Sequence, residues 1–126
     1  MKKITCVIGA RPQFIKHFPL EIALRKFFNV KTIHTGQHFD KNMSNVFFDE
    51  LGIKSPDFRL NLTSSGHGGQ TAEMLKLIEN ILIEEKTEIM LVYGDTNSTL
   101  AGALAAAKLN IPIIHVEAGL RSFNKN

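Results

Sequence analysis

The sequence predicts an α/β domain with a doubly wound, mostly parallel β-sheet. Short apolar runs rich in β-branched residues alternate along the 126 residues with segments of helical periodicity. The apolar runs lack polar alternation, which is typical of parallel strands that are buried on both faces. Strands that alternate with helices favour one layered sheet over two separate units. We therefore expect a single Rossmann-like domain over residues 1–126.

Four apolar runs are the expected strands, at residues 4–9, 30–35, 89–93 and 112–116. The only cysteine, Cys6, lies within the first run, so no disulfide can form within the chain. We expect a small buried hydrophobic side chain there, in a protein of the reducing cytoplasm.

The first two connections between these strands show helical patterns. Apolar residues keep helical spacing from about residue 12 to 28, and Pro19 inside this stretch predicts a kink or a restart of the helix. A second, shorter helix over residues 43–51 is expected to end at Gly52, because glycine readily adopts the left-handed conformation of a C-terminal cap.

The later connections are a loop and two further helices. Residues 55–69 contain Pro, Asn, Thr, Ser and three glycines, which predicts an extended connection and then a mobile loop. A helix from about residue 70 to 85 is expected to place one apolar set on a single face: Leu75, Ile78, Ile81 and Leu82. The Ala-rich helix over 95–109 has small side chains, which indicate close packing onto the sheet.

Composition excludes several classes of protein. Hydrophobic residues make up 44% and charged residues 21%, a balance typical of a soluble globular protein. The longest apolar runs are far shorter than the roughly 20 residues that cross a bilayer, so no membrane association is expected. Basic residues are scattered among acidic ones at a net charge of +3, which argues against nucleic acid and suits an anionic small molecule.

The loops that follow the four strands carry the candidate functional residues. They read GARP from residue 9, GQH from residue 36, GDT from residue 94 and EAGLR from residue 117. Ligands of open parallel sheets bind beyond the carboxyl ends of the strands, which meet at one edge. Each loop combines glycine with a charged residue, a histidine or an amide, so together they predict a site at that edge.

The first loop suggests anion recognition. Gly9 precedes a helix start, and Arg11 and Lys16 bring two cations near the free N–H groups of that first turn. A solvated basic helix start without a ligand remains the alternative. The chain has neither a GxGxxG nor a Walker A sequence, so no phosphate-binding fingerprint supports the assignment.

Two carboxylates are candidates for proton transfer, and each has a structural alternative. Asp95 precedes the Ala-rich helix, so it is either the N-cap of that helix or a catalytic group. Glu117 emerges from the last strand beside Gly119 and either forms an ion pair with Arg121 or acts as a general acid or base.

The chain has five histidines: His17, His34, His38, His67 and His115. Their spacings match no zinc pattern, so we expect neither a metal nor a cofactor. His67 is expected to be a polar residue in a loose turn. His115 lies inside a strand and is expected to be a buried core histidine.

Four segments in chain order resemble the non-hydrolysing UDP-N-acetylglucosamine 2-epimerases. They are GARPQFIK from residue 9, TGQH from 35, GDTNSTLAG from 94 and HVEAGLRS from 115, and they span nearly the whole chain. The resemblance implies the N-terminal domain of a two-domain fold of the glycosyltransferase-B type, with the second domain beyond Asn126. It also implies a UDP-sugar bound in the cleft, a homodimeric full-length protein, and an isolated 126-residue chain that is inactive.

The same resemblance implies roles for particular residues. Arg11 and Lys16 would face the diphosphate, and Asp95 and Glu117 would be the acid/base residues near the sugar. Arg121 would also bind substrate. Three further residues match positions that hold a second, regulatory UDP-sugar in some members: Gln37, His38 and Gln70.

The implied reaction explains these residue types. No carbonyl acidifies the hydrogen on the second carbon of the sugar, so the family expels UDP while removing that proton, which gives a glycal. UDP then adds back, with protonation from the opposite face. Cations stabilise the leaving diphosphate and carboxylates move the protons.

Some residues depart from the family pattern. Ala10 and Gln13 stand where many members have Thr and Glu, and this variant also resembles the epimerases of UDP-2,3-diacetamido-2,3-dideoxyglucuronate. Phe39 follows His38, and Gly69 precedes Gln70, which argues against allosteric activation. The sequence is also compatible with a glycosyltransferase of the same two-domain architecture and with a non-catalytic nucleotide-binding module.

Overall fold

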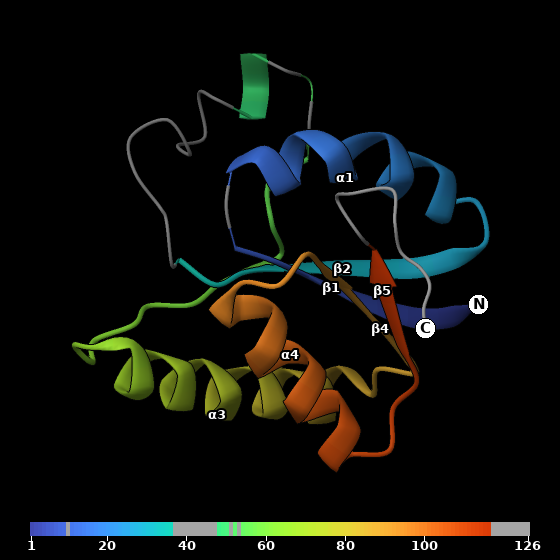
Figure 1. Ribbon diagram of the computed structural model, residues 1–126. Coiled ribbons are helices and arrows are strands. Elements are labelled where there is room, and N and C mark those ends of the chain that lie inside the picture. Colours follow the sequence, from blue (N-terminus) through green and yellow to red (C-terminus); the bar gives the residue numbers. More distant parts are fainter. Residues whose placement is uncertain (10, 37–47, 51, 53, 117–126) are drawn as a thin grey trace.

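The computed structural model describes residues 1–9, 11–36, 48–50, 52 and 54–116, and for Arg11 the backbone alone. These residues form a five-stranded sheet in the order β3-β2-β1-β4-β5, and every neighbouring pair is parallel (Figure 1). The strands are β1 (Lys2–Ile8), β2 (Phe28–His34), β3 (Phe58–Arg59), β4 (Ile89–Tyr93) and β5 (Ile113–Val116). The predicted parallel α/β fold is confirmed.

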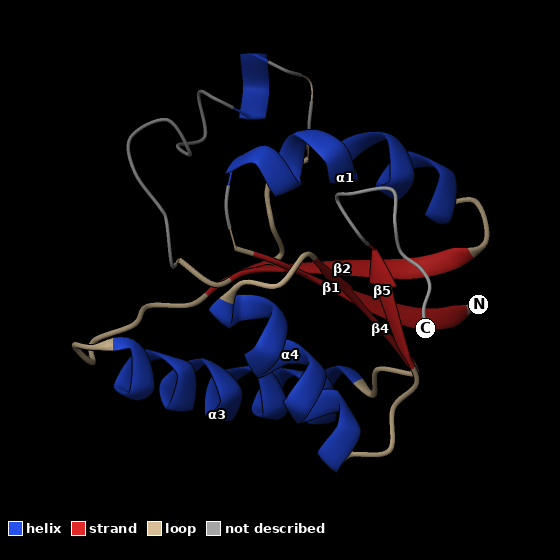
Figure 2. Ribbon diagram, viewed as in Figure 1, coloured by secondary structure: helices blue, strands red, loops and turns tan. Residues whose placement is uncertain are grey.

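Helices cover both faces of the sheet. Helix α1 (Arg11–Leu24) lies on one face, and α3 (His67–Glu85) and α4 (Asn97–Lys108) lie on the other (Figure 2). Successive residues of β1 point to opposite faces, so Ile4, Cys6 and Ile8 pack in the α1 core while Val7 packs in the α3/α4 core. The two-sided core explains why the central strands are continuous apolar runs.

Helix α1 differs from its expected form. It runs as one helix through Pro19, so the predicted restart does not occur, and it ends at Leu24 instead of near residue 28. A proline inside a helix removes one backbone hydrogen bond, and the buried Phe14 and His17 hold the helix against the sheet. Phe27, one of the apolar residues near the end of the predicted helical stretch, is 71% exposed.

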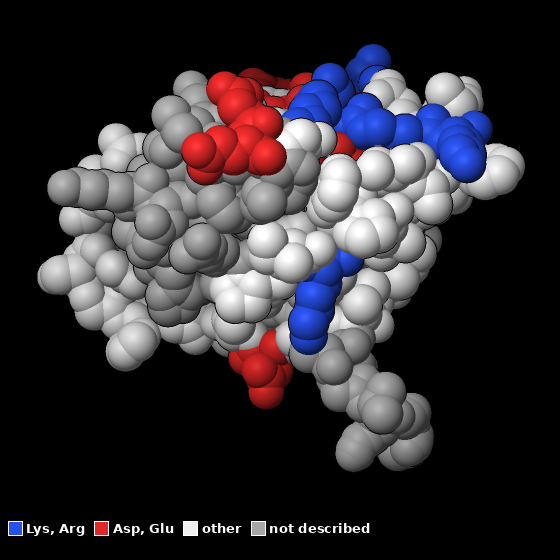
Figure 3. Space-filling model, turned by 90° about the horizontal axis from the view of Figure 1, so that it is seen from above, with Lys and Arg blue, Asp and Glu red and all other residues white. Residues whose placement is uncertain are grey.

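Among the described residues, the face that carries α1 has a broad area without charged side chains (Figure 3). Lys and Arg side chains gather mainly along one border of this face (Figure 3). Ile15 and Ile22 of α1 are about half exposed, although both belong to the apolar pattern that predicted the helix. The apolar residues of α1 therefore extend around more of the helix surface than the part that packs against the sheet.

The connection before α3, predicted as an extended segment and a mobile loop over residues 55–69, has more regular structure than expected. It contains the short strand β3, and α3 begins at His67, so His67 and the two following glycines belong to the helix and not to a loose loop. The Glu73 carboxylate fastens this connection to α3, because it accepts hydrogen bonds from the backbone N–H groups of Thr63 and Ser64 at 2.9 and 3.0 Å. The buried face of α3 consists of Met74, Ile78 and Leu82, with the expected Leu75 and Ile81 half-buried beside it.

Edge strand β5 is not buried on both faces, contrary to the prediction. Ile113 is 38% and Ile114 is 46% exposed. Within the described ranges only α4 and β4 make substantial contact with β5, which leaves much of the strand open.

Close approach of α4 to the sheet explains two glycines. A Cβ on Gly102 would lie 3.3 Å from methyl groups of Val7 and Val92. A Cβ on Gly9 would lie 2.4 Å from the Ser98 hydroxyl oxygen, so glycine is required at the end of β1 by packing. The small residues of α4 thus have the predicted structural role.

Two other expectations concern the second helix and the membrane. Residues 48–50 are helical and Gly52 has φ 68°, the left-handed conformation expected of a cap, while the remainder of the predicted 43–51 helix lies outside the described residues. No helix in the described part of the chain has the length and apolar character to cross a membrane.

Candidate functional site

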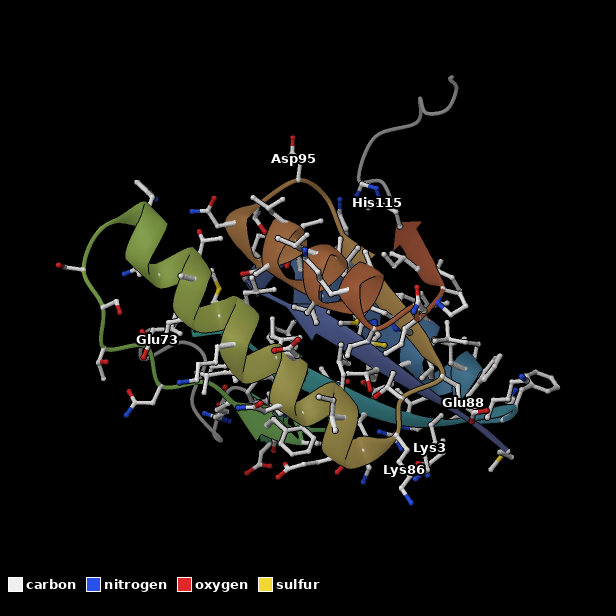
Figure 4. The ribbon with its side chains drawn as sticks, turned by 90° about the horizontal axis from the view of Figure 1, so that it is seen from below. Lys3, Glu73, Lys86, Glu88, Asp95 and His115 are labelled. Atoms are coloured by element: carbon white, nitrogen blue, oxygen red, sulfur yellow. The ribbon has the colours of Figure 1, made fainter. Side chains whose placement is uncertain are left out.

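The candidate residues that the structure describes lie at the carboxyl edge of the sheet. Asp95 and His115 project at one end of the molecule, and Lys3, Lys86 and Glu88 lie at the opposite end (Figure 4). Asp95 follows β4 after one residue, Gly94, and Arg11 and Lys16 belong to the first turns of α1, which begins after β1. The parallel strands therefore bring residues far apart in the sequence to one edge, as predicted.

Two hollows lie on either side of Gly94, and we call them together the Gly94 site. The hollow on the α1 side has a volume of about 190 Å³ and includes Lys16, Gln13 and Val116 in its lining. The hollow on the α4 side has a volume of about 420 Å³ and includes Asp95 and His115. Gly94 lines both, so the lysine and the carboxylate flank the same short turn.

Gly94 is held in place by the end of β5. Its backbone has φ 64°, a conformation that favours glycine. Its N–H donates to the Val116 carbonyl at 3.0 Å, and its own carbonyl accepts a hydrogen bond from His115 Nε2. The prediction that His115 is a buried core histidine is therefore wrong: the side chain is exposed and fastens the turn that presents Asp95.

Asp95 does not cap α4. The N-cap is Thr96, whose side-chain oxygen accepts a hydrogen bond from Thr99 N at 3.3 Å. The Asp95 side chain is exposed and has no hydrogen bond or ion pair to any residue of the described ranges. Of the two roles that the sequence left open for Asp95, the structural one is excluded, and its carboxylate is available to a ligand.

Lys16 and the start of α1 form the cationic part of the site. Lys16 is exposed and lines the α1-side hollow. Arg11 is the first residue of α1, and its side chain lies outside what the structure describes, as do four other predicted site residues: Gln37, His38, Glu117 and Arg121. Within the described ranges, no three His, Cys, Asp or Glu residues gather in a way that could hold a metal ion.

Gln13 is a site residue that the sequence did not predict. Its side-chain oxygen accepts a hydrogen bond from Gly9 N at 2.7 Å, and its Nε2 donates to the Tyr93 carbonyl at 3.4 Å. One amide thus joins the ends of β1 and β4, a use that requires a donor and an acceptor in the same side chain. The only signal in the sequence was its departure from the glutamate of many family members.

Gln70 lies in a separate hollow, which we call the Gln70 hollow, at the ends of β2 and β3. Its volume is about 400 Å³, and its lining consists of His34, Gly36, Arg59, Leu60, Asn61, Leu62 and Gln70. Burial, and then the nearby Arg59 charge, lower the pKa of His34 to about 4, so the ring is neutral at pH 7. Its Nδ1 accepts a hydrogen bond from Gly36 N at 2.9 Å.

Comparison with known proteins identifies relatives of this chain. The sequence profile of the UDP-N-acetylglucosamine 2-epimerase family matches residues 20–126. A Methanococcus maripaludis protein named as a homolog of that enzyme is 59% identical over 98% of this chain. A UDP-2,3-diacetamido-2,3-dideoxy-D-glucuronate 2-epimerase of Pseudomonas aeruginosa is 55% identical over 97% of it. The chain spans about a third of the length of these relatives, 34% and 35%.

A solved structure agrees in fold. The UDP-GlcNAc 2-epimerase of Methanocaldococcus jannaschii, in complex with UDP-GlcNAc and UDP, is 48% identical and superposes with a TM-score of 0.83. The match covers 97% of this chain and 34% of that protein.

Proposed function

Because this chain belongs to the UDP-N-acetylglucosamine 2-epimerase family, we propose that it supplies part of the active site of an enzyme that interconverts UDP-GlcNAc and UDP-ManNAc. The single observation that carries the proposal is the Asp95 carboxylate, which is exposed beside Gly94 and is not used as a cap. Solved relatives crystallised with UDP-GlcNAc give the substrate class.

The proposed reaction is an elimination followed by an addition. A base takes the proton from the second carbon of the sugar, a C1–C2 double bond forms, and the bond from C1 to the diphosphate oxygen breaks and releases UDP. The addition reverses these steps with a proton delivered to the other face of C2. Atoms and electrons balance without any oxidant or cofactor, and the result is an isomerisation.

The predicted site residues suit this chemistry. Lys16, and Arg11 at the start of α1, are assigned to the leaving diphosphate, whose negative charge grows as the C1–O bond breaks. Asp95 is assigned to proton transfer on one face of C2. Glu117 is assigned to proton transfer on the opposite face. Arg121 is assigned to substrate binding, and Gln37, His38 and Gln70 to further UDP-sugar contacts, without allosteric activation.

A second domain is proposed to complete the cleft. The Gly94 site is a pair of shallow hollows on one edge of one sheet, whereas small-molecule sites bury most of their ligand. Relatives are about three times as long as this chain, which leaves ample length for a facing domain. We accordingly expect the 126-residue chain by itself to be inactive.

A hybrid enzyme tests the proposal. In it, residues 1–126 of this chain replace the segment of the M. jannaschii enzyme that they match. Incubated with UDP-GlcNAc in D₂O, the hybrid should form UDP-ManNAc and incorporate deuterium at C2 of both sugars, followed by proton NMR. A correctly folded hybrid that neither forms the product nor exchanges the C2 proton would contradict the proposal.

The uronate substrate is a second candidate function. The 55% identical relative from P. aeruginosa is named for UDP-2,3-diacetamido-2,3-dideoxy-D-glucuronate. The same hybrid, assayed with each UDP-sugar in turn, ranks the two by kcat/KM. Relatives named as epimerases support neither the glycosyltransferase alternative nor a non-catalytic module.

We further propose that the complete protein is a homodimer of the cytoplasm. Ile15 and Ile22 of α1 are large apolar side chains that are about half exposed, which suits contact with a second copy. The single cysteine, Cys6, is buried as a free thiol, and burial raises its pKa, which suits a reducing compartment. Light scattering of the hybrid with Ile15→Lys and Ile22→Lys should report a loss of the dimer.

A further inference from the structure

Tyr93, the last residue of β4, is held at both ends by side chains of the flanking helices. Its hydroxyl group contacts His17 Nδ1, and its carbonyl accepts hydrogen bonds from Gln13 Nε2 and from the Thr99 hydroxyl. Tyr93 is 5% exposed and directly precedes the Gly94–Asp95 turn. The position of Asp95 therefore depends on contacts that Tyr93 makes with α1 and α4.

The His17 ring is fixed by a second hydrogen bond. It is 2% exposed and packs edge-on against the Tyr93 ring, and its Nε2 lies 3.1 Å from Glu21 Oε1. Burial raises the pKa of Glu21, but hydrogen bonds from His17, Arg25 and Thr32 outweigh burial and lower it to about 2. The carboxylate is ionised and can only accept, so Nε2 carries a proton and donates.

The other ring nitrogen then faces the Tyr93 hydroxyl. Burial, with the nearby Cys6 and Glu21, raises the pKa of Tyr93, so the phenol keeps its proton. When Nε2 carries the only ring proton, Nδ1 can only accept, and the phenol proton is the hydrogen that it faces. A defined chain of donors thus runs from Tyr93 through His17 to Glu21.

Gln13 and His17 lie one turn apart on the same face of α1. Lys16 comes directly before His17, and it lines the hollow that Tyr93 and Gly94 also line. An apolar side chain at residue 17 could fill the same space. Hydrogen bonds, however, depend on both distance and direction, so the polar side chains fix the position of α1 relative to the end of β4 more closely than apolar packing would.

We propose that Gln13 and His17 are positioning residues that clamp Tyr93 and thereby set Lys16 of α1 relative to the Asp95 turn of β4. The inference rests on the proposed function for its catalytic consequence, because Lys16 and Asp95 act on opposite sides of one sugar–phosphate bond. His17 is buried and lines neither hollow of the Gly94 site, and Gln13, which lines the α1-side hollow, acts through its hydrogen bonds to Gly9 and Tyr93. Displacements of about 1 Å between such groups are enough to slow a reaction strongly.

Variants of the hybrid enzyme test the clamp. Tyr93→Phe removes only the hydroxyl group, and His17→Leu removes its partner. Each should lower kcat about 10-fold and change KM less than about twofold, since the substrate contacts remain. The double variant should be no slower than either single variant, because both remove one hydrogen bond. His17→Asn, which keeps a polar group near Nδ1, should recover part of kcat.

A buried pair that joins β1 to the residues just before β4 provides the matched control. Thr5 and Thr87 share a hydroxyl hydrogen bond of 2.6 Å. Thr5→Val should lower the melting temperature as Tyr93→Phe does, yet leave kcat unchanged. If Tyr93→Phe and His17→Leu lower only the melting temperature, or if their effects on kcat multiply, the clamp is overturned.

NMR of the 126-residue chain separates this proposal from the proposed function. Long-range proton–nitrogen spectra should place the His17 ring proton on Nε2, and Tyr93→Phe should shift the signals of Gly94 and of the Asp95 carboxyl group, whereas Thr5→Val should not. These shifts would support the clamp even if the hybrid had no epimerase activity. Unchanged Gly94 and Asp95 signals in Tyr93→Phe would overturn it even if the hybrid were active.

Discussion

The Gly94 site and the Gln70 hollow lie at the same edge of one sheet but are built from different groups. The Gly94 site has an exposed carboxylate without a partner among the described residues, and a lysine across the turn. The described lining of the Gln70 hollow has a neutral histidine, an arginine and two amides, with no carboxylate. Strand ends alone therefore provide a binding surface, and proton transfer needs a free acidic group as well.

The largest expected effect is a loss of kcat when the carboxylate that distinguishes the Gly94 site from the Gln70 hollow is removed. Asp95→Asn in the hybrid enzyme should lower kcat about 10²- to 10⁴-fold, the usual contribution of a positioned acid or base. Its melting temperature should stay within about a degree, because Thr96 provides the cap. Glu84→Gln on α3 is the control for loss of one negative charge. An Asp95→Asn enzyme of normal rate would place proton transfer elsewhere.

The next effect concerns how tightly each region is packed. Gly9→Ala should destabilise the protein by about 1–3 kcal/mol, because the new methyl group would overlap the Ser98 side chain. Gly9→Ala combined with Ser98→Gly should regain part of the loss. A Cβ added at Gly68, near the Gln70 hollow, would meet nothing within 4 Å beyond its chain neighbours and its own helix backbone. Gly68→Ala should therefore not destabilise α3. Urea unfolding measures all of these variants, and equal losses for Gly9→Ala and Gly68→Ala would contradict the contrast in packing.

A smaller effect is a dependence of stability on pH that comes from the Gln70 hollow. The pKa of His34 falls from its ordinary value of 6.5 to about 4 on folding, so the unfolded chain binds the proton more readily. Stability should therefore decrease as the pH falls from about 6.5 to 4. Below 4.5 the loss of charge on Glu21, whose folded pKa is about 2, should add to the decrease.

His34→Asn isolates that contribution. Its amide oxygen can still accept the hydrogen bond from Gly36, but it does not titrate. Unfolding free energies at pH 7, 5.5 and 4.6 should show a flatter profile for His34→Asn than for the unchanged chain. A slope unaffected by His34→Asn would refute the assignment.

The smallest effect is expected at Gln70 itself. Gln70→Ala in the hybrid should change kcat less than about twofold, because the Gln70 hollow is separate from the Asp95 turn. The rate should depend hyperbolically on the UDP-sugar concentration, in line with the predicted lack of allosteric activation. A sigmoidal curve that Gln70→Ala makes hyperbolic would instead show that the two regions communicate.

The prediction of the site from sequence was uneven. Lys16 and Asp95 were expected at one edge, and the structure places them on the two sides of Gly94. Gln13 and His17 were not recognised, because nothing near them in the chain indicates a partner. Their hydrogen bonds reach Tyr93 across 80 and 76 residues.

By itself the sequence determined the fold class, the strand runs and the edge at which the functional loops gather. Those features depend on local periodicity and on the rule that parallel strands end together. Only the tertiary structure decided that Thr96 and not Asp95 caps α4, that His115 faces outward, and that Tyr93 is held by α1. Such choices depend on which side chain meets which neighbour after packing, and no local pattern encodes that.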